Sequence, residues 1–156
     1  MRRRQRGFSL IELLIVVAII LIIAAIAIPN LLRSKMAANE ASAVGSLRTL
    51  DSSCVVYDTT YGSYPKSLSN LGPGNPATSA SADLIDSLLA GGTKSGYVFT
   101  YTPGVSDPSG NVLNYSITAS PISPGTTGQR GFYTDQSGVI RANTTGTADG
   151  NSPPLS

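Results

Sequence analysis

A long apolar run near the N-terminus constrains this chain more than any other feature. Between Phe8 and Ile28 the only ionisable side chain is Glu12. As an α-helix these 21 residues extend about 31 Å, at about 1.5 Å per residue, and are long enough to cross a bilayer. A carboxylate in such a helix costs about 2.5 to 3.5 kcal/mol at the bilayer centre and less near an end. We therefore expect Glu12 to have a partner and a function.

The segment before the run is strongly basic. Four of the chain's 11 Lys and Arg residues lie in residues 1–7, and the chain has 9 Asp and Glu residues. Basic flanks stay cytoplasmic, so we expect an N-in orientation with the C-terminal bulk outside. Without residues 1–7 the net side-chain charge is −2. The remaining chain therefore lacks the excess of positive charge that is typical of nucleic-acid-binding proteins.

The sequence G-F-S-L-I-E at Gly7–Glu12 follows the Arg-rich leader and precedes the apolar run. It resembles the class III signal of type IV pilins and of the pseudopilins of type II secretion. The resemblance implies a leader of residues 1–7, cut between Gly7 and Phe8 by a prepilin peptidase that methylates the new amine of Phe8. It also implies a mature subunit that waits in the bacterial inner membrane and joins a helical filament of identical subunits at an inner-membrane assembly platform.

Two residues of the apolar segment, residues 8–29, acquire roles from this resemblance. In a filament the apolar surface is buried against identical helices, so Glu12 is expected to pair with the amine of Phe8 of a neighbouring subunit and to set the register. The position that matches Pro29 marks a bend in family members. A helix-interior proline removes a backbone hydrogen bond and tends to kink the helix. A simple boundary between anchor and domain is the alternative.

Beyond Pro29 the apolar residues follow a helical stripe, with most charged residues off it. The pattern predicts one helix over about residues 8–58. Cys54 lies on the stripe, where we expect a small buried hydrophobe. As the only cysteine it cannot form the intramolecular disulfide that closes the C-terminal loop of many type IV pilins. The stripe consists of Leu32, Met36, Ala43, Leu47, Leu50, Cys54 and Tyr57, and the residues placed off it are Arg33, Lys35, Glu40, Arg48 and Asp51.

The rest of the chain predicts an α+β head over residues 30–142 and a flexible tail over residues 143–156. Ser81–Leu89 reads as a short helix with Ser81 as its cap. Alternating segments predict three or four antiparallel strands that cover the C-terminal half of the long helix, as in the pilin fold. The expected strands are Tyr97–Thr102, Asn114–Ala119, Gly131–Thr134 and Val139–Ala142.

The sequence offers little for catalysis. It has no histidine, which excludes a Ser-His-Asp triad and a His-ligated metal, so we expect no enzyme. Major pseudopilins carry calcium in their C-terminal loops, but no dense run of oxygen ligands surrounds Asp107 or Asp135. No metal or other cofactor is expected.

Several functions fit these features. The main expectation is the major pilin of a type IV pilus, an extracellular filament for adhesion or motility. The alternative is the major pseudopilin of a type II secretion system, in a periplasmic pseudopilus. A membrane-tethered periplasmic binding module, uncut at Gly7, is a third. An ordinary secretory signal that ends at Ala25-Ile26-Ala27 is disfavoured, because Glu12 interrupts the apolar region.

Overall fold

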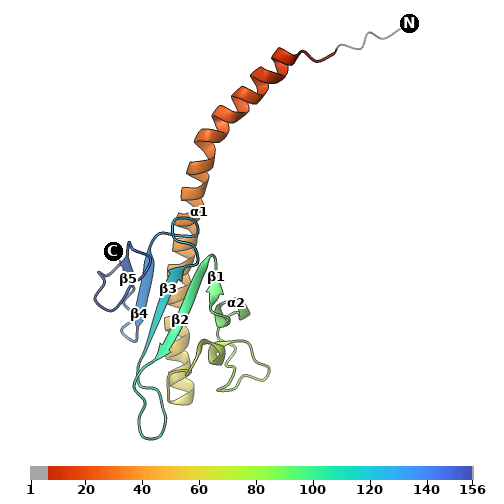
Figure 1. Ribbon diagram of the computed structural model, residues 1–156. Helices are drawn as coiled ribbons and strands as arrows, with labels where there is room; N and C mark the ends of the chain where they lie inside the picture. The colour runs from red at the N-terminus through yellow and green to blue at the C-terminus, as the bar shows by residue number, and fades with distance from the viewer. Residues whose placement is uncertain (1–6, 156) are drawn as a thin grey trace. The chain divides into compact units, whose positions relative to one another are not determined.

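The computed structural model describes residues 7–155, so most of the expected leader lies outside the described residues. A long helix, α1, spans Leu10–Tyr61 and precedes a mixed helix and strand region (Figure 1). The chain divides into two compact units at Lys35/Met36, and α1 contributes to both. The remaining elements are the 3₁₀-helix η1 (Leu68–Leu71), α2 (Ser87–Ala90), β1 (Thr93–Lys94), β2 (Tyr97–Pro103), β3 (Tyr115–Pro121), β4 (Gly131–Asp135) and β5 (Arg141–Asn143).

Helix α1 is continuous from Leu10 to Tyr61 and contains Pro29 in its interior. It therefore extends beyond the expected end near residue 58. Gly62 ends the helix with a left-handed φ of 72°, and its N–H donates to the carbonyl oxygen of Asp58 at 2.7 Å. A glycine accepts this conformation without a Cβ penalty, which makes it a common helix terminator.

The five strands form one antiparallel sheet in the order β1-β2-β3-β4-β5. The longest pairing joins β2 and β3 from Tyr97 opposite Pro121 to Pro103 opposite Tyr115. Alternate residues of β3 are buried, as expected for a sheet with one face toward a core. The α+β pilin-like fold is confirmed, with the two-residue β1 added to the expected strands.

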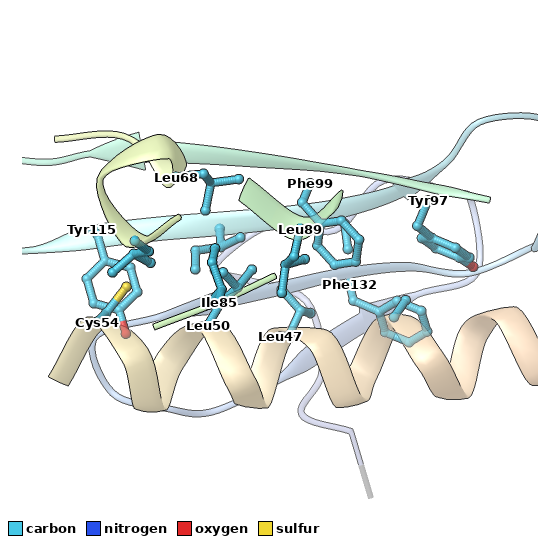
Figure 2. Packing of buried hydrophobic residues seen from close by; sticks show 14 of the residues in the cluster. Leu47, Leu50, Cys54, Leu68, Ile85, Leu89, Tyr97, Phe99, Tyr115 and Phe132 are labelled. Carbon is cyan, nitrogen blue, oxygen red and sulfur yellow. The ribbon is translucent and has the colours of Figure 1, made fainter. Parts of the chain in front are cut away.

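The core lies between the sheet and the second half of α1. Figure 2 shows Leu47, Leu50 and Cys54 of α1 directed toward the sheet, where Phe99 and Phe132 meet them. Burial of each large side chain stabilises the fold by about 1.5 to 3 kcal/mol. The stripe prediction is confirmed for its five later members, Ala43, Leu47, Leu50, Cys54 and Tyr57, all of which are buried.

The stripe prediction is wrong at its beginning and at one charged position. Leu32 is 47% exposed and precedes Met36, where the second compact unit begins, whereas Glu40, expected off the stripe, is only 8% exposed. Glu40 can be buried because backbone N–H groups and an arginine satisfy its carboxylate, as described below.

The predicted helix Ser81–Leu89 is also wrong over most of its length. Only Ser87–Ala90 are helical, and Asp86 rather than Ser81 is the cap, accepting from the N–H of Leu89 at 2.9 Å. Asp83 has a φ of +55°, which a right-handed helix does not allow. The N–H groups of residues 82–85 donate to carbonyls of residues 70–72 instead of to one another.

The C-terminal segment is attached to the sheet. β5 begins at Arg141, two residues later than expected. Residues 143–156 were predicted as a flexible tail, but Ala142 N–H donates to Pro153 and Leu155 N–H donates to Ile140, at 3.0 and 2.8 Å. These bonds hold residues 153–155 along β5.

Candidate assembly site

The residues of the predicted cleavage and assembly site surround the start of α1. Gly7 and Phe8 precede the helix; Phe8 is 74% exposed, and a Cβ at Gly7 would meet nothing within 4 Å. The carboxylate of Glu12 accepts a hydrogen bond from the backbone N–H of Ser9 at 2.9 Å. Glu12 thus accepts from a backbone N–H that has no partner within the helix. The helix dipole also favours a negative charge at this end of α1.

This capping contact was not among the features expected from the sequence, although the local residues carry its signal. Ser9-Leu10-Ile11-Glu12 has the S-x-x-E spacing of a capping box, in which the third helical residue reaches back to the cap. The structure forms that backward contact. Glu12 therefore has a role within its own chain, and its pairing with the amine of a neighbouring subunit stays a prediction.

The first half of α1 presents its apolar side chains to the surroundings. From Phe8 to Leu32 every large hydrophobic residue is at least 44% exposed. The helix is long and apolar enough to cross a membrane. So much contiguous apolar surface requires a membrane or other subunits to cover it. The helical backbone passes through Pro29, and bending there stays a prediction.

The head is fixed to α1 by a buried carboxylate. One oxygen of Glu40 accepts from the backbone N–H groups of Gln129 and Arg130, at 2.9 and 3.1 Å, and the other accepts from Arg130 Nε at 2.8 Å. Burial alone would raise the pKa of Glu40, but these hydrogen bonds and the Arg130 charge outweigh burial and hold the pKa below its usual value. The β3–β4 connection is thereby joined to the helix.

A second carboxylate crosses the interface between α1 and the sheet. Asp51 accepts from Thr134 Oγ1 at 2.8 Å and from the Tyr115 hydroxyl at 3.2 Å. Burial raises the pKa of Asp51, while these hydrogen bonds lower it and the charge of Asp135 raises it further. Asp51 was expected off the stripe, and its local sequence carries no sign of this contact, because its partners lie more than sixty residues away.

The other residues considered for chemistry have structural roles. Asp107 accepts from the backbone of Ser109 and Asn111, and Asp135 accepts from that of Ser137, each within its own turn. Among residues 7–155 no group of three His, Cys, Asp or Glu residues could hold a metal ion. Cys54 is buried as predicted, and burial raises the pKa of its thiol to about 12.

An exposed apolar helix with a head packed on its second half is typical of a subunit anchored in a membrane by its N-terminal helix. A family model for the prokaryotic N-terminal methylation motif matches residues 2–28. By this motif and its fold the chain resembles the type IV pilins and the type II secretion pseudopilins. The family implies a multi-subunit filament assembled at the membrane.

Relatives of both kinds resemble the chain. It is 36% identical over 72 residues to type II secretion system core protein G of Dickeya chrysanthemi, covering 46% of this chain and 47% of that protein. The corresponding Escherichia coli protein is 30% identical over 95 residues, covering 61% and 62%. The type IV wide pilus major component of Thermus thermophilus is 60% identical over 38 residues, covering 24% and 29%. The chain thus spans about half the length of the first of these relatives, and none of the three names denotes an enzyme.

Proposed function

We propose that this chain is the major pseudopilin of a type II secretion system, a subunit that polymerises through α1 into a short periplasmic filament. The proposal that the subunit polymerises rests on one observation: the first half of α1 is apolar and exposed, whereas the second half packs against the head. The first half can enter a membrane before assembly and a bundle of identical helices after it. This proposal replaces the type IV pilus as the main expectation.

The choice of a pseudopilin rests on how far the similarities extend. Matches to core protein G cover 62 to 95 residues, whereas those to two pilins cover 38 and 47 residues. The C-terminal segment also supports this choice, because many type IV pilins close this part of the chain with a disulfide. Here backbone hydrogen bonds to residues 140–142 hold the segment, and the only cysteine is buried in the core. The higher identity of the shorter pilin matches, 60% and 53%, keeps a type IV pilin as the second candidate.

We further propose the family roles for four residues. Gly7 and Phe8 form the cleavage site, Phe8 becomes the methylated terminus, Glu12 docks the subunit, and Pro29 lets the helix bend on assembly. Support comes from the open surroundings of Gly7, the exposure of Phe8, and the position of Glu12 at the start of the helix.

The first test combines mass spectrometry with a secretion assay in a strain that lacks the chain. We expect a mature chain that begins at methylated Phe8 in the membrane fraction, and restored export of secreted enzymes on complementation. The same terminus in abundant sheared surface filaments, with unchanged export, would favour the pilin instead. A chain still uncut at Gly7 would contradict both and support the tethered module.

Two substitutions separate processing from docking. Gly7→Val should block cleavage, because it changes the residue before the proposed cut. It should not disturb the fold, because the valine side chain would enter open space. Glu12→Leu should be cleaved and inserted into the membrane but not assembled, because it loses the carboxylate and keeps the apolar surface. Ile15→Leu, which changes neither property, is the matched control and should behave as the unmodified chain.

A further inference from the structure

The head carries a groove beside α1. It has a volume of about 390 Å³, and the segment of α1 from Ala37 to Arg48 borders it together with Arg130 and Leu155. Ala37, Ala41 and Gly45 are exposed, and a Cβ on Gly45 would meet nothing within 4 Å. Small residues along the helix thus leave room for side chains from another molecule.

The groove has an apolar floor and a positively charged rim. Val44 and Leu155 are half-buried and pack against the core, so they present aliphatic surface at the bottom. Leu155 is held in place by its hydrogen bond to Ile140. Arg48 is exposed on the rim and belongs to neither of the two salt bridges found among residues 7–155.

A complementary projection lies on the β2–β3 connection. Val105 and Leu113 are 67% and 57% exposed, and the N–H of Leu113 donates to the carbonyl of Val105 at 2.9 Å, so the two aliphatic side chains belong to one paired tip. Asp107 lies in the same connection, and hydrogen bonds from the backbone and side chain of Asn111 hold its pKa below the usual value. The tip is thus apolar with a negative charge, opposite in sign to the groove rim.

The groove and the tip belong to opposite ends of the head. The tip is tied to the end of α1, because Tyr64 N–H donates to Val112 and Val112 N–H donates to Ser63, at 3.0 and 2.9 Å. Figure 1 shows the β2–β3 connection beside the last turns of α1, at the far end of the sheet from β1. Gly45 lies sixteen residues before Tyr61, a separation of about 24 Å along the helix.

We propose that the tip formed by Val105 and Leu113 of one copy inserts into the groove over Gly45 and Val44 of another copy, with Asp107 facing Arg48. Two different surfaces at opposite ends of one rigid head make a heterologous contact, which leaves a free groove and a free tip after each addition. Such a contact builds an open helical array where successive rotations do not close into a ring, and it does not build a closed dimer. This inference rests on the proposed polymerising function and adds a contact between heads to the contacts of the apolar helices.

Cysteine cross-linking tests the contact in the full-length chain in membranes. Cys54 is completely buried, so introduced cysteines would be the reactive ones. We expect the double variant G45C/V105C, treated with a short bismaleimide, to give a ladder of dimers, trimers and larger species. Each single variant should give at least tenfold less product, because a heterologous contact does not bring two copies of one surface together.

The matched control replaces the tip residue with another of equal exposure. Leu88 is 66% exposed, close to the 67% of Val105, but lies in α2. G45C/L88C should therefore give no ladder. Filaments of wild-type chain with no ladder from G45C/V105C, or an equal ladder from G45C/L88C, would overturn the head contact and leave the proposed function intact. A wild-type chain that forms no assembly would overturn both.

A second variant fills the groove without introducing a cross-link. Gly45→Leu should leave the tyrosine circular dichroism of the head unchanged, because the added side chain enters open space, and should reduce filament yield at least fivefold. Thr49→Leu, exposed one turn further along α1 and outside the groove lining, should retain the yield. Normal filaments from the Gly45→Leu variant would contradict the proposal.

Discussion

Glu40 and Arg130, ninety residues apart in sequence, are joined through both the backbone and the side chain of the arginine. The carboxylate also accepts from Gln129, so one helix residue orders the connection between β3 and β4. This connection and the end of the chain together flank the groove on α1. The attachment of the head to its helix is therefore part of the surface proposed for assembly.

Glu40→Gln should destabilise the head by about 1 to 3 kcal/mol at pH 7, since it replaces hydrogen bonds to a charged acceptor with weaker ones at a buried site. All seven tyrosines lie in the head, so near-ultraviolet circular dichroism during urea unfolding in detergent measures it selectively. Arg130→Gln is the control: the arginine side chain is 43% exposed, and the loss should stay below about 1 kcal/mol. Equal losses of unfolding free energy for the two variants would contradict a stabilising role for the backbone N–H contacts of Gln129 and Arg130 to Glu40.

The same carboxylate makes the head sensitive to acid. The folded-state pKa of Glu40 is lowered, so its contribution is present above the unfolded pKa of about 4.3 and is lost as the pH falls through the folded value. The difference in unfolding free energy between wild type and Glu40→Gln should thus shrink from pH 7 to pH 3. A constant difference would show that the charge of Glu40 does not stabilise the head.

Asp51 should have the opposite pH dependence. Burial raises its folded-state pKa, so its contribution is fully present below the unfolded pKa of about 3.9 and is lost as the pH rises through the folded pKa. Asp51→Asn should therefore become more stable relative to wild type between pH 4 and pH 7, measured by the same urea titrations. Thr134→Val should cost about 1 to 3 kcal/mol, because Thr134 is fully buried and its hydroxyl donates to the half-buried carboxylate of Asp51.

Core truncation should separate the two faces of α1. Leu47 is fully buried, whereas Val56 on the same helix is 48% exposed. Leu47→Ala should destabilise the head by about 2 to 5 kcal/mol, and Val56→Ala by less than about 0.5 kcal/mol. The urea midpoint measures the loss of stability in both variants. A comparable loss for Val56→Ala would mean that Val56 makes a contact that is absent from the isolated subunit.

Cys54 should report opening of the core. Its thiol is fully buried and has a pKa raised to about 12, and thiolate is the form that reacts. We expect a thiol reagent at pH 8 to label the folded chain at least a hundredfold more slowly than the chain in urea. Rapid labelling without denaturant would contradict the packing of Cys54 between α1 and the sheet.

The sequence by itself determined the long helix, its division into an apolar and an amphipathic half, and the main strands. These features are local: helical and strand periodicities are visible in short windows, and the G-F-S-L-I-E signal is contiguous. The burial of Leu47, Leu50 and Cys54 follows from the same stripe.

Only the tertiary structure decided how the polar residues are used. Glu40 is buried because Gln129 and Arg130 reach it, and the half-buried Asp51 faces the sheet because Thr134 and Tyr115 donate to it. Residues 82–85 are not helical because they bond to residues 70–72. In each case the competing partner is distant in sequence or belongs to another element. Patterns within one segment cannot reveal such partners, because a hydrogen bond depends on atoms that only the completed fold brings together.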